Sequence, residues 1–234
     1  MIVLRKRGII IAITLLSALV ALIICLNSLS SSMLSDTSVN KFKIVLDAGH
    51  GGVDGGVTGI STGVNESELN LIIVKKLEKL LVSSGFNVVL TRSSDAGLYG
   101  VATGNLKRRD MLKRKEIIEK AKPDLVVSIH LNKFSVTTRR GAQVFFKQDD
   151  EDGKKLATCI QSFFNSLEES TRDFHALKGD YYILNCTSYP SVIAECGFLS
   201  NPEEEKLLLS SDYQDKIVEA LFKGITSYLL QNDK

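Results

Sequence analysis

Histidine and cysteine, the side chains that most often bind transition metals, are scarce in this chain. Its 234 residues include three histidines and four cysteines. No two cysteines have the C-x-x-C spacing, so the sequence contains no zinc knuckle. Cys159, Cys186 and Cys196 lie beyond the N-terminal segment, and a domain of this size does not need disulfides to fold. We therefore expect buried thiols, although a bridge between Cys186 and Cys196 remains open.

An excess of positive charge is also missing. The chain has 29 basic and 27 acidic residues, a formal net charge of +2. The only charged residues before position 41 are Arg5, Lys6, Arg7 and Asp36, and without them basic and acidic residues are equal in number. Proteins that bind nucleic acids usually carry a basic surface. The balanced charge therefore predicts that nucleic acid is not a partner.

The N-terminal forty residues differ from the rest of the chain. Three cations at residues 5–7 precede an uncharged apolar run over residues 8–26, about the length that spans a bilayer. Cations on this flank place the N-terminus in the cytoplasm and the remainder outside. We interpret residues 1–27 as a signal-anchor or signal peptide. An uncleaved anchor is favoured because the run is long for a signal peptide and lacks a clear Ala-x-Ala site. The Ser-rich residues 28–40 are predicted to be a linker.

Residues 41–234 alternate strand-like and helix-like blocks, without an internal repeat. Continuous apolar runs of strand length occur at residues 43–48, 86–92, 124–130, 141–146, 181–186 and 191–198. Runs that are apolar throughout, instead of at alternate positions, indicate strands covered on both faces. We therefore predict a single α/β domain, with a mostly parallel twisted sheet of about six strands flanked by helices on both faces.

Capping and breaking residues mark the helices between these strands. Asn65 is expected to cap the first helix, with Glu68 completing a capping box. The buried face of this helix is predicted from apolar residues at helical spacing: Leu69, Ile73, Leu77 and Leu80. The other helices are predicted at residues 109–120, 152–167 and 212–230, with a short helix that begins at Asn201 and Pro202.

Ionisable side chains occur at the predicted carboxyl ends of the strands, where α/β folds bind ligands. His50 follows the first strand, His130 ends the third, and Glu195 lies near the end of the last. Glu66 begins the helix that follows a glycine-rich loop, residues 51–56, whose glycines let the backbone approach a ligand closely. Two imidazoles and one carboxylate are a typical ligand set for catalytic zinc, and a second carboxylate beside the attacking water would serve hydrolysis.

Each of these residues also has a structural explanation. A histidine after a strand is often only hydrogen-bonded, and the helix dipole alone favours Glu66 in a first turn. The explanation is weaker for Glu195, because a carboxylate within an apolar strand is costly to bury unless it is paired, protonated or near a cation. For Asp47, bracing the loop is favoured over catalysis. His175 is interpreted as a surface or loop histidine.

Several ordered motifs resemble one enzyme family. The segments "IVLDAGHGGVDGG", "GVNESELNL", "KPDLVVSIHLN" and "SVIAECGFLSNPEEEKLL" are similar to the catalytic domain of zinc-dependent N-acetylmuramoyl-L-alanine amidases, called amidase type 3. The similarity covers nearly all of residues 43–230. It implies that His50, Glu66 and His130 bind Zn²⁺ and that Glu195 is the catalytic carboxylate. The implied substrate is the amide between the lactyl group of N-acetylmuramic acid and L-alanine in peptidoglycan.

A short amidase with an anchor resembles the spore-cortex subfamily, the CwlD-like enzymes. This similarity implies a role in cortex maturation, where removal of the stem peptide precedes formation of muramic-δ-lactam. It also implies an extracytoplasmic location, anchored or secreted, in the intermembrane space of the developing spore. No cell-wall-binding repeat accompanies the catalytic domain, so an activating or targeting protein partner is expected.

Two other interpretations compete with a zinc amidase. One is a non-catalytic or partner-dependent peptidoglycan-binding or activator protein that retains the fold; the presence of all four matched residues argues against it. The other makes Cys196 a nucleophile with His130. Neighbours on a strand point to opposite faces, so Cys196 is expected to point away from Glu195.

Overall fold

The computed structural model describes residues 42–101, 104–170 and 173–232. The strands in this part of the chain are β1 (Lys43–Ala48), β2 (Asn87–Leu90), β3 (Leu125–Asn132), β4 (Gln143–Phe146), β5 (Leu177–Lys178) and β6 (Ser191–Phe198). The helices are α2 (Glu66–Ser83), α3 (Leu106–Ala121), α4 (Glu151–Asn165), α5 (Tyr182–Asn185), α6 (Pro202–Leu208) and α7 (Ser211–Asn232).

The six described strands form one sheet in the order β2-β1-β3-β6-β4-β5. Strands β2, β1, β3 and β6 are parallel, β4 is antiparallel to β6, and β5 is parallel to β4. The predicted mostly parallel sheet is confirmed. Because β1, β3 and β6 run in the same direction, their carboxyl ends meet at one edge, where His130 is paired in register with Glu195.

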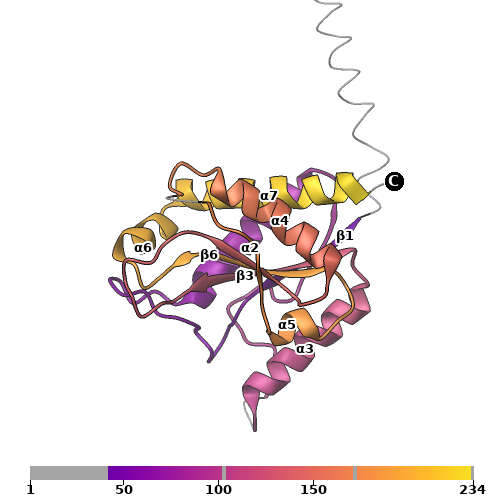
Figure 1. Ribbon diagram of the computed structural model, residues 1–234. Coiled ribbons are helices and arrows are strands. Elements are labelled where there is room, and N and C mark those ends of the chain that lie inside the picture. The colour runs from indigo at the N-terminus through magenta and orange to yellow at the C-terminus, as the bar shows by residue number, and fades with distance from the viewer. Residues whose placement is uncertain (1–41, 102–103, 171–172, 233–234) are drawn as a thin grey trace, which may run out of the picture. The chain divides into compact units, whose positions relative to one another are not determined.

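Helices cover both faces of this sheet, as predicted. Helices α2, α4 and α7 lie on one face, and α3 and α5 lie on the other (Figure 1). Helix α6 packs against β6 and α7. Burial on both sides explains why the central strands are apolar at nearly every position.

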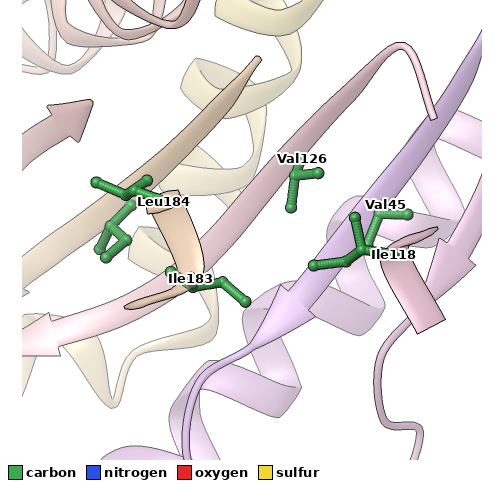
Figure 2. Packing of buried hydrophobic residues seen from close by; sticks show 6 residues of the cluster. Val45, Ile118, Val126, Ile183 and Leu184 are labelled. Carbon is green, nitrogen blue, oxygen red and sulfur yellow. The ribbon is translucent and has the colours of Figure 1, made fainter. Parts of the chain in front are cut away.

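The face of the sheet that α3 and α5 cover has its own apolar cluster, which Figure 2 shows in close-up. It consists of Val45, Ile118, Val126, Ile183, Leu184 and Ile193. Side chains alternate along a strand, so residues two positions further along share the face. Asp47 on β1 and Glu195 on β6 therefore follow Val45 and Ile193 on the same side of the sheet.

The strand predicted at residues 181–186 is wrong. This segment forms the single helical turn α5, and the sixth strand is instead the short β5. The buried residues of α5 are the consecutive Ile183 and Leu184, whereas Tyr181 and Tyr182 are exposed. Consecutive burial suits a helical turn laid on the sheet, and an apolar run this short does not separate the two structures by periodicity.

Most other helix limits are close to the predictions. Leu69, Ile73 and Leu77 are buried on α2, and fully buried Leu81 completes this face in place of half-buried Leu80. The Asn65 side chain makes no cap to the backbone, and its amide donates to Glu68 Oε1 at 3.2 Å instead. Helix α3 begins earlier than predicted, at Leu106, because the Asn105 side chain caps it.

The structure also bears on the membrane segment and the cysteines. None of the helices among the described residues is long and apolar enough to cross a membrane. The predicted anchor, residues 1–27, and linker, residues 28–40, lie outside those residues. Cys159, Cys186 and Cys196 are free thiols, so the bridge between Cys186 and Cys196 is not formed.

Candidate metal centre and active site

Three of the predicted site residues converge at the carboxyl edge of the sheet. Glu66 is the first residue of α2 and is 2% exposed. Its Oε2 lies 3.2 Å from His50 Nε2, and its Oε1 lies 2.9 Å from His130 Nδ1. Each residue offers one donor atom, and these three atoms lie within 4.8 Å of one another. The residues could together hold a metal ion.

The donor set fits zinc. Two imidazole nitrogens and one carboxylate oxygen are the protein ligands of many catalytic zinc sites. Bonds of about 2.0–2.1 Å at tetrahedral angles place neighbouring donor atoms roughly 3.3 Å apart. The separations of 3.2 and 2.9 Å between Glu66 and the two imidazoles are close to this value. The two contacts involve different oxygens of Glu66, and one donor atom from each residue lies within 4.8 Å of the others, so binding one ion requires the three side chains to move closer together.

The electrostatics of the cluster favour a cation. Burial alone would raise the pKa of Glu66, but hydrogen bonds and charge from His130 and His50 hold it well below its usual range. Burial alone would lower the pKa of His50, but Glu66 and Asp54 outweigh it and raise that pKa. Protons and metal ions compete for the same nitrogen atoms. The ionised Glu66 therefore provides negative charge at the point where a metal ion would bind.

Two arginines hold the loop that carries His50, whose φ of 61° is unusual for a residue with a side chain. The fully buried Arg114 donates to the carbonyls of Ala48, at 2.8 Å, and His50, at 2.6 Å. Arg92 donates to Ala48 O at 2.8 Å and to Gly49 O at 2.9 Å. Neither arginine was predicted from the sequence. Arg114 lies in a charged stretch of α3 that resembles a solvated helix face.

Two carboxylates balance the charge of Arg114 inside the protein. Its Nη1 lies 2.5 Å from Asp47 Oδ1 and its Nε lies 2.6 Å from Asp110 Oδ2. Asp47 also accepts hydrogen bonds of 2.6 Å from the hydroxyls of Thr91 and Ser128. Burial would raise the pKa of Asp47, but Arg114 and the two hydroxyls lower it to about 2. Asp47 thus braces the loop, the role favoured from the sequence.

Two glycines leave room for the histidine rings. A Cβ on Gly49 would lie 2.2 Å from His130 Cε1, so only glycine fits below that ring. Gly56 has φ +71°, and a Cβ there would lie 2.5 Å from Glu66 Oε2. From the sequence, the glycines of residues 51–56 were expected to let the backbone approach a ligand closely. Gly49, which precedes His50, was not singled out.

Glu195 lies beside this cluster and differs from it in its hydrogen bonding. Its Oε2 is buried and has no hydrogen-bond partner among the described residues. Burial raises its pKa to about 7; His130 lowers it and Glu66 raises it further. A carboxylate that titrates near neutral pH and has a free oxygen can accept and return a proton.

The cluster and Glu195 line one pocket of about 520 Å³. Its walls come from α3, through Lys107 and Met111, and from the segment at α5, through Tyr181 and Tyr182. The volume is in the range of typical ligand pockets. The pocket thus places a candidate metal centre, a candidate general base and space for a substrate together.

The remaining chemical candidates lie elsewhere. Cys196 is fully buried, and burial raises the pKa of its thiol well above its usual value, with Glu195 and Glu204 adding to this effect. Cys196 does not line the pocket, which argues against a cysteine nucleophile. His175 is exposed in a loop, as expected, and its carbonyl accepts a hydrogen bond from Gln143.

Comparisons with known proteins agree with this geometry. The family model described as N-acetylmuramoyl-L-alanine amidase matches residues 44–227. The germination-specific N-acetylmuramoyl-L-alanine amidase of Bacillus subtilis (strain 168) is 35% identical over 192 residues, which are 80% of this chain and 80% of that protein. The amidase AmiA of Escherichia coli (strain K12) is 29% identical and covers 82% of this chain and 77% of its own length.

A solved structure gives the same result in three dimensions. The CwlD amidase from Clostridioides difficile, in complex with the GerS lipoprotein, superposes with a TM-score of 0.79 and 39% sequence identity. The match covers 82% of this chain and 100% of that one. The family match runs from β1 into α7 and so includes every strand that carries the pocket. This chain therefore belongs to the N-acetylmuramoyl-L-alanine amidases, enzymes that hydrolyse an amide bond of peptidoglycan.

Proposed function

We propose that this amidase binds Zn²⁺ through His50, Glu66 and His130 and uses Glu195 as its general base and acid. The bond cleaved is the amide between the lactyl group of N-acetylmuramic acid and L-alanine. One observation carries the proposal: Glu66 contacts both imidazoles, and the unpartnered oxygen of Glu195 lies in the same pocket.

The protein's own groups account for the proton transfers. When bound, zinc supplies Lewis acidity, which polarises the scissile carbonyl and makes a neighbouring water more acidic. Glu195 Oε2 accepts the proton of the attacking water, because no described group occupies this oxygen. Its pKa of about 7 then allows Glu195 to return the proton to the leaving nitrogen of L-alanine. Arg92 and Arg114 hold the His50 loop in place during both transfers.

Mass analysis of muropeptides tests the reaction. The full-length zinc-loaded protein should release an intact stem peptide that begins with L-alanine. A metal chelator should stop this release, and added zinc should restore it. Alkylation of thiols should leave it unchanged, because Cys196 is buried outside the pocket. Cleavage of another bond, or cleavage that continues after the metal has been removed, would contradict the proposal.

We also propose a role in maturation of the spore cortex. The support comes from relatives: one is named a germination-specific amidase, and another was solved with a lipoprotein partner. Removal of the stem peptide would leave the lactyl carboxyl free for muramic-δ-lactam formation. Spores that lack the gene should contain no muramic-δ-lactam, and the wild-type gene should restore it. Normal amounts of the lactam in the deletion strain would exclude this role.

The relative solved with a lipoprotein supports a protein partner outside the cytoplasmic membrane, where peptidoglycan lies. We propose that such a partner activates or targets this amidase, and that residues 1–27 keep it at the membrane surface facing the forming cortex. Purification of the tagged chain from sporulating cells should recover a bound extracytoplasmic protein that increases its turnover. Full activity and normal localisation without any bound protein would argue against this dependence.

A further inference from the structure

A second, aromatic pocket adjoins the catalytic pocket. Its volume is about 220 Å³, and it shares Asn132 and Tyr181 with the larger pocket. Its walls are largely aromatic, with contributions from Phe134, Phe145, Phe174 and Phe198. A substrate whose scissile amide lies near Glu195 can therefore extend past Asn132 and Tyr181 into this second space.

One charged side chain is held over these rings. The guanidinium carbon of Arg139 lies 4.6 Å from the centroid of the Phe134 ring and 5.8 Å from that of Phe198. Stacking on aromatic faces orients a guanidinium group and leaves the N–H donors in its plane available. The planar fork of Arg139 is therefore preoriented for a ligand.

The charge of Arg139 has no acidic partner in the part of the chain that the structure describes. Its neighbour Arg140 forms an ion pair of 3.1 Å with Glu203. Of the described residues that line the aromatic pocket, Arg139 alone is charged. The pocket thus combines aromatic side chains and two amides, Asn132 and Gln143, with one cation that has no acidic partner among the described residues.

We propose that this pocket, here called the Arg139 pocket, binds a free carboxylate of the stem peptide while the L-alanine amide lies at Glu195. This inference rests on the proposed function, because it assigns a contact to the same substrate. The residue after L-alanine in the stem is D-glutamate, which is linked through its side chain and leaves its α-carboxylate free. Arginine binds carboxylates through two parallel hydrogen bonds, and the aromatic walls suit the aliphatic part of the peptide.

The alternative ligand for the Arg139 pocket is the glycan part of the substrate. Sugar rings stack on aromatic side chains without a need for charge, so a glycan subsite would not distinguish a free carboxylate from an amide. Two forms of one muropeptide therefore separate the alternatives. One carries the free α-carboxylate on D-glutamate, and in the other this group is amidated.

The experiment measures binding of both muropeptides by calorimetry. It uses the full-length, zinc-loaded Glu195→Gln protein, so that little substrate is consumed during the titration. The free-carboxylate form should bind about 10- to 100-fold more tightly than the amidated form, the range expected for hydrogen bonds to a charged group. Arg139→Ala and Arg139→Gln should each abolish this preference, because they should weaken binding of the free-carboxylate form more than binding of the amidated form.

Arg140→Ala is the matched control, because it removes the adjacent cation that already has a partner. It should retain the preference. Equal binding of the two forms, a preference that survives Arg139→Ala, or no binding of either form would each overturn the proposal. Turnover by the protein with Glu195 intact is measured separately, so a failure of the amidase assignment can be told from a failure of this carboxylate contact.

Discussion

At Glu195, a proposed catalytic role and an unfavourable burial coincide. Its Oε2 lies inside the protein without a hydrogen-bond partner among the described residues, and its pKa is raised to about 7. An unpaired buried carboxylate is costly for folding. The same features make it a base that can both take up and release a proton at neutral pH. The burial of Glu195 thus lowers the stability of the fold and at the same time suits its proposed role as a base.

Glu195→Gln tests this interpretation. The change removes the charge and keeps the shape, so turnover should fall by about 10²- to 10⁴-fold, the usual contribution of a general base. Zinc content should be unchanged, because Glu195 is not one of the three clustered residues that could hold the metal. Thermal unfolding should occur at the same or a higher temperature. Unchanged turnover, or loss of bound zinc, would contradict the assigned role.

Asp47 differs from Glu195 in that its buried charge is fully paired, so its ionised form favours folding. Its pKa of about 2 lies below the ordinary value of 3.8. The ionised form therefore stabilises the fold above about pH 4, and this stabilisation is lost as the pH falls towards 2. The shift corresponds to about 2 kcal/mol.

The comparison of wild type with Asp47→Asn measures this effect. Urea unfolding of the metal-free protein at several pH values should show the wild type losing about 2 kcal/mol more than the variant between pH 5 and pH 2. At pH 7 the variant should be less stable, because Arg114 then lacks one of its two buried carboxylates. Parallel pH curves for the two proteins would show that Asp47 does not have the lowered pKa.

Among the elements, the loop between β1 and α2 contributes most to the candidate metal centre. It carries His50, packs Gly49 against the His130 ring and leads into Glu66 at the start of α2. The part of this loop around Ser61 and Thr62 is also held by hydrogen bonds. The fully buried Glu205 on α6 accepts hydrogen bonds from the backbone N–H groups of Ser61, at 2.7 Å, and Thr62, at 2.9 Å. The loop is therefore attached to the folded domain at several points.

Gly49→Ala should weaken metal binding, because its Cβ would displace the His130 ring. We expect the affinity for zinc to fall by about 10- to 100-fold, as for other changes that misplace a ligand. Gly63→Ala is the control: Gly63 lies in the same loop with φ +76°, and a Cβ there meets nothing within 4 Å. Backbone strain should reduce the stability of the control while zinc affinity stays normal. Equal zinc affinities in the two variants, measured by competition with a chelator, would refute the steric argument.

The elements also show where sequence patterns are sufficient. Strands β1, β3 and β6 were predicted correctly because a long, largely apolar run of strand length has few other solutions. The segment at α5 was predicted as a strand, and β5 was missed. Both segments are short; β5 lies at the edge of the sheet and α5 packs on its face, and in both places packing on existing neighbours outweighs local preference.

For the molecule as a whole, the apolar residues 8–26 predict attachment to a membrane. The protein from cell fractions should be found with membranes, and its intact mass should show that residues 1–27 are retained. External protease should digest the catalytic domain in cells whose wall has been removed. A shorter mature mass together with a soluble protein would indicate a cleaved signal peptide.

The identity of the chemical groups follows from the sequence alone. Three histidines, two of them at the ends of apolar strands, and two carboxylates were enough to expect a zinc site for hydrolysis in an α/β fold, and the resemblance of the ordered motifs to a known family implied an amidase. These features are local, or depend on the shared direction of parallel strands, so they can be read along the chain.

Tertiary structure decides which groups meet and what surrounds them. The Glu66 bridge between His50 and His130 and the ion pair of Arg114 with Asp47 join segments that are apart in the chain, and the burial of Glu195 Oε2 without a partner depends on several such segments. The stacking of Arg139 on Phe134 and Phe198 also depends on packing at the end of β6. Burial and pairing set the pKa values, and both exist only after the chain has folded, so no local pattern can reveal them.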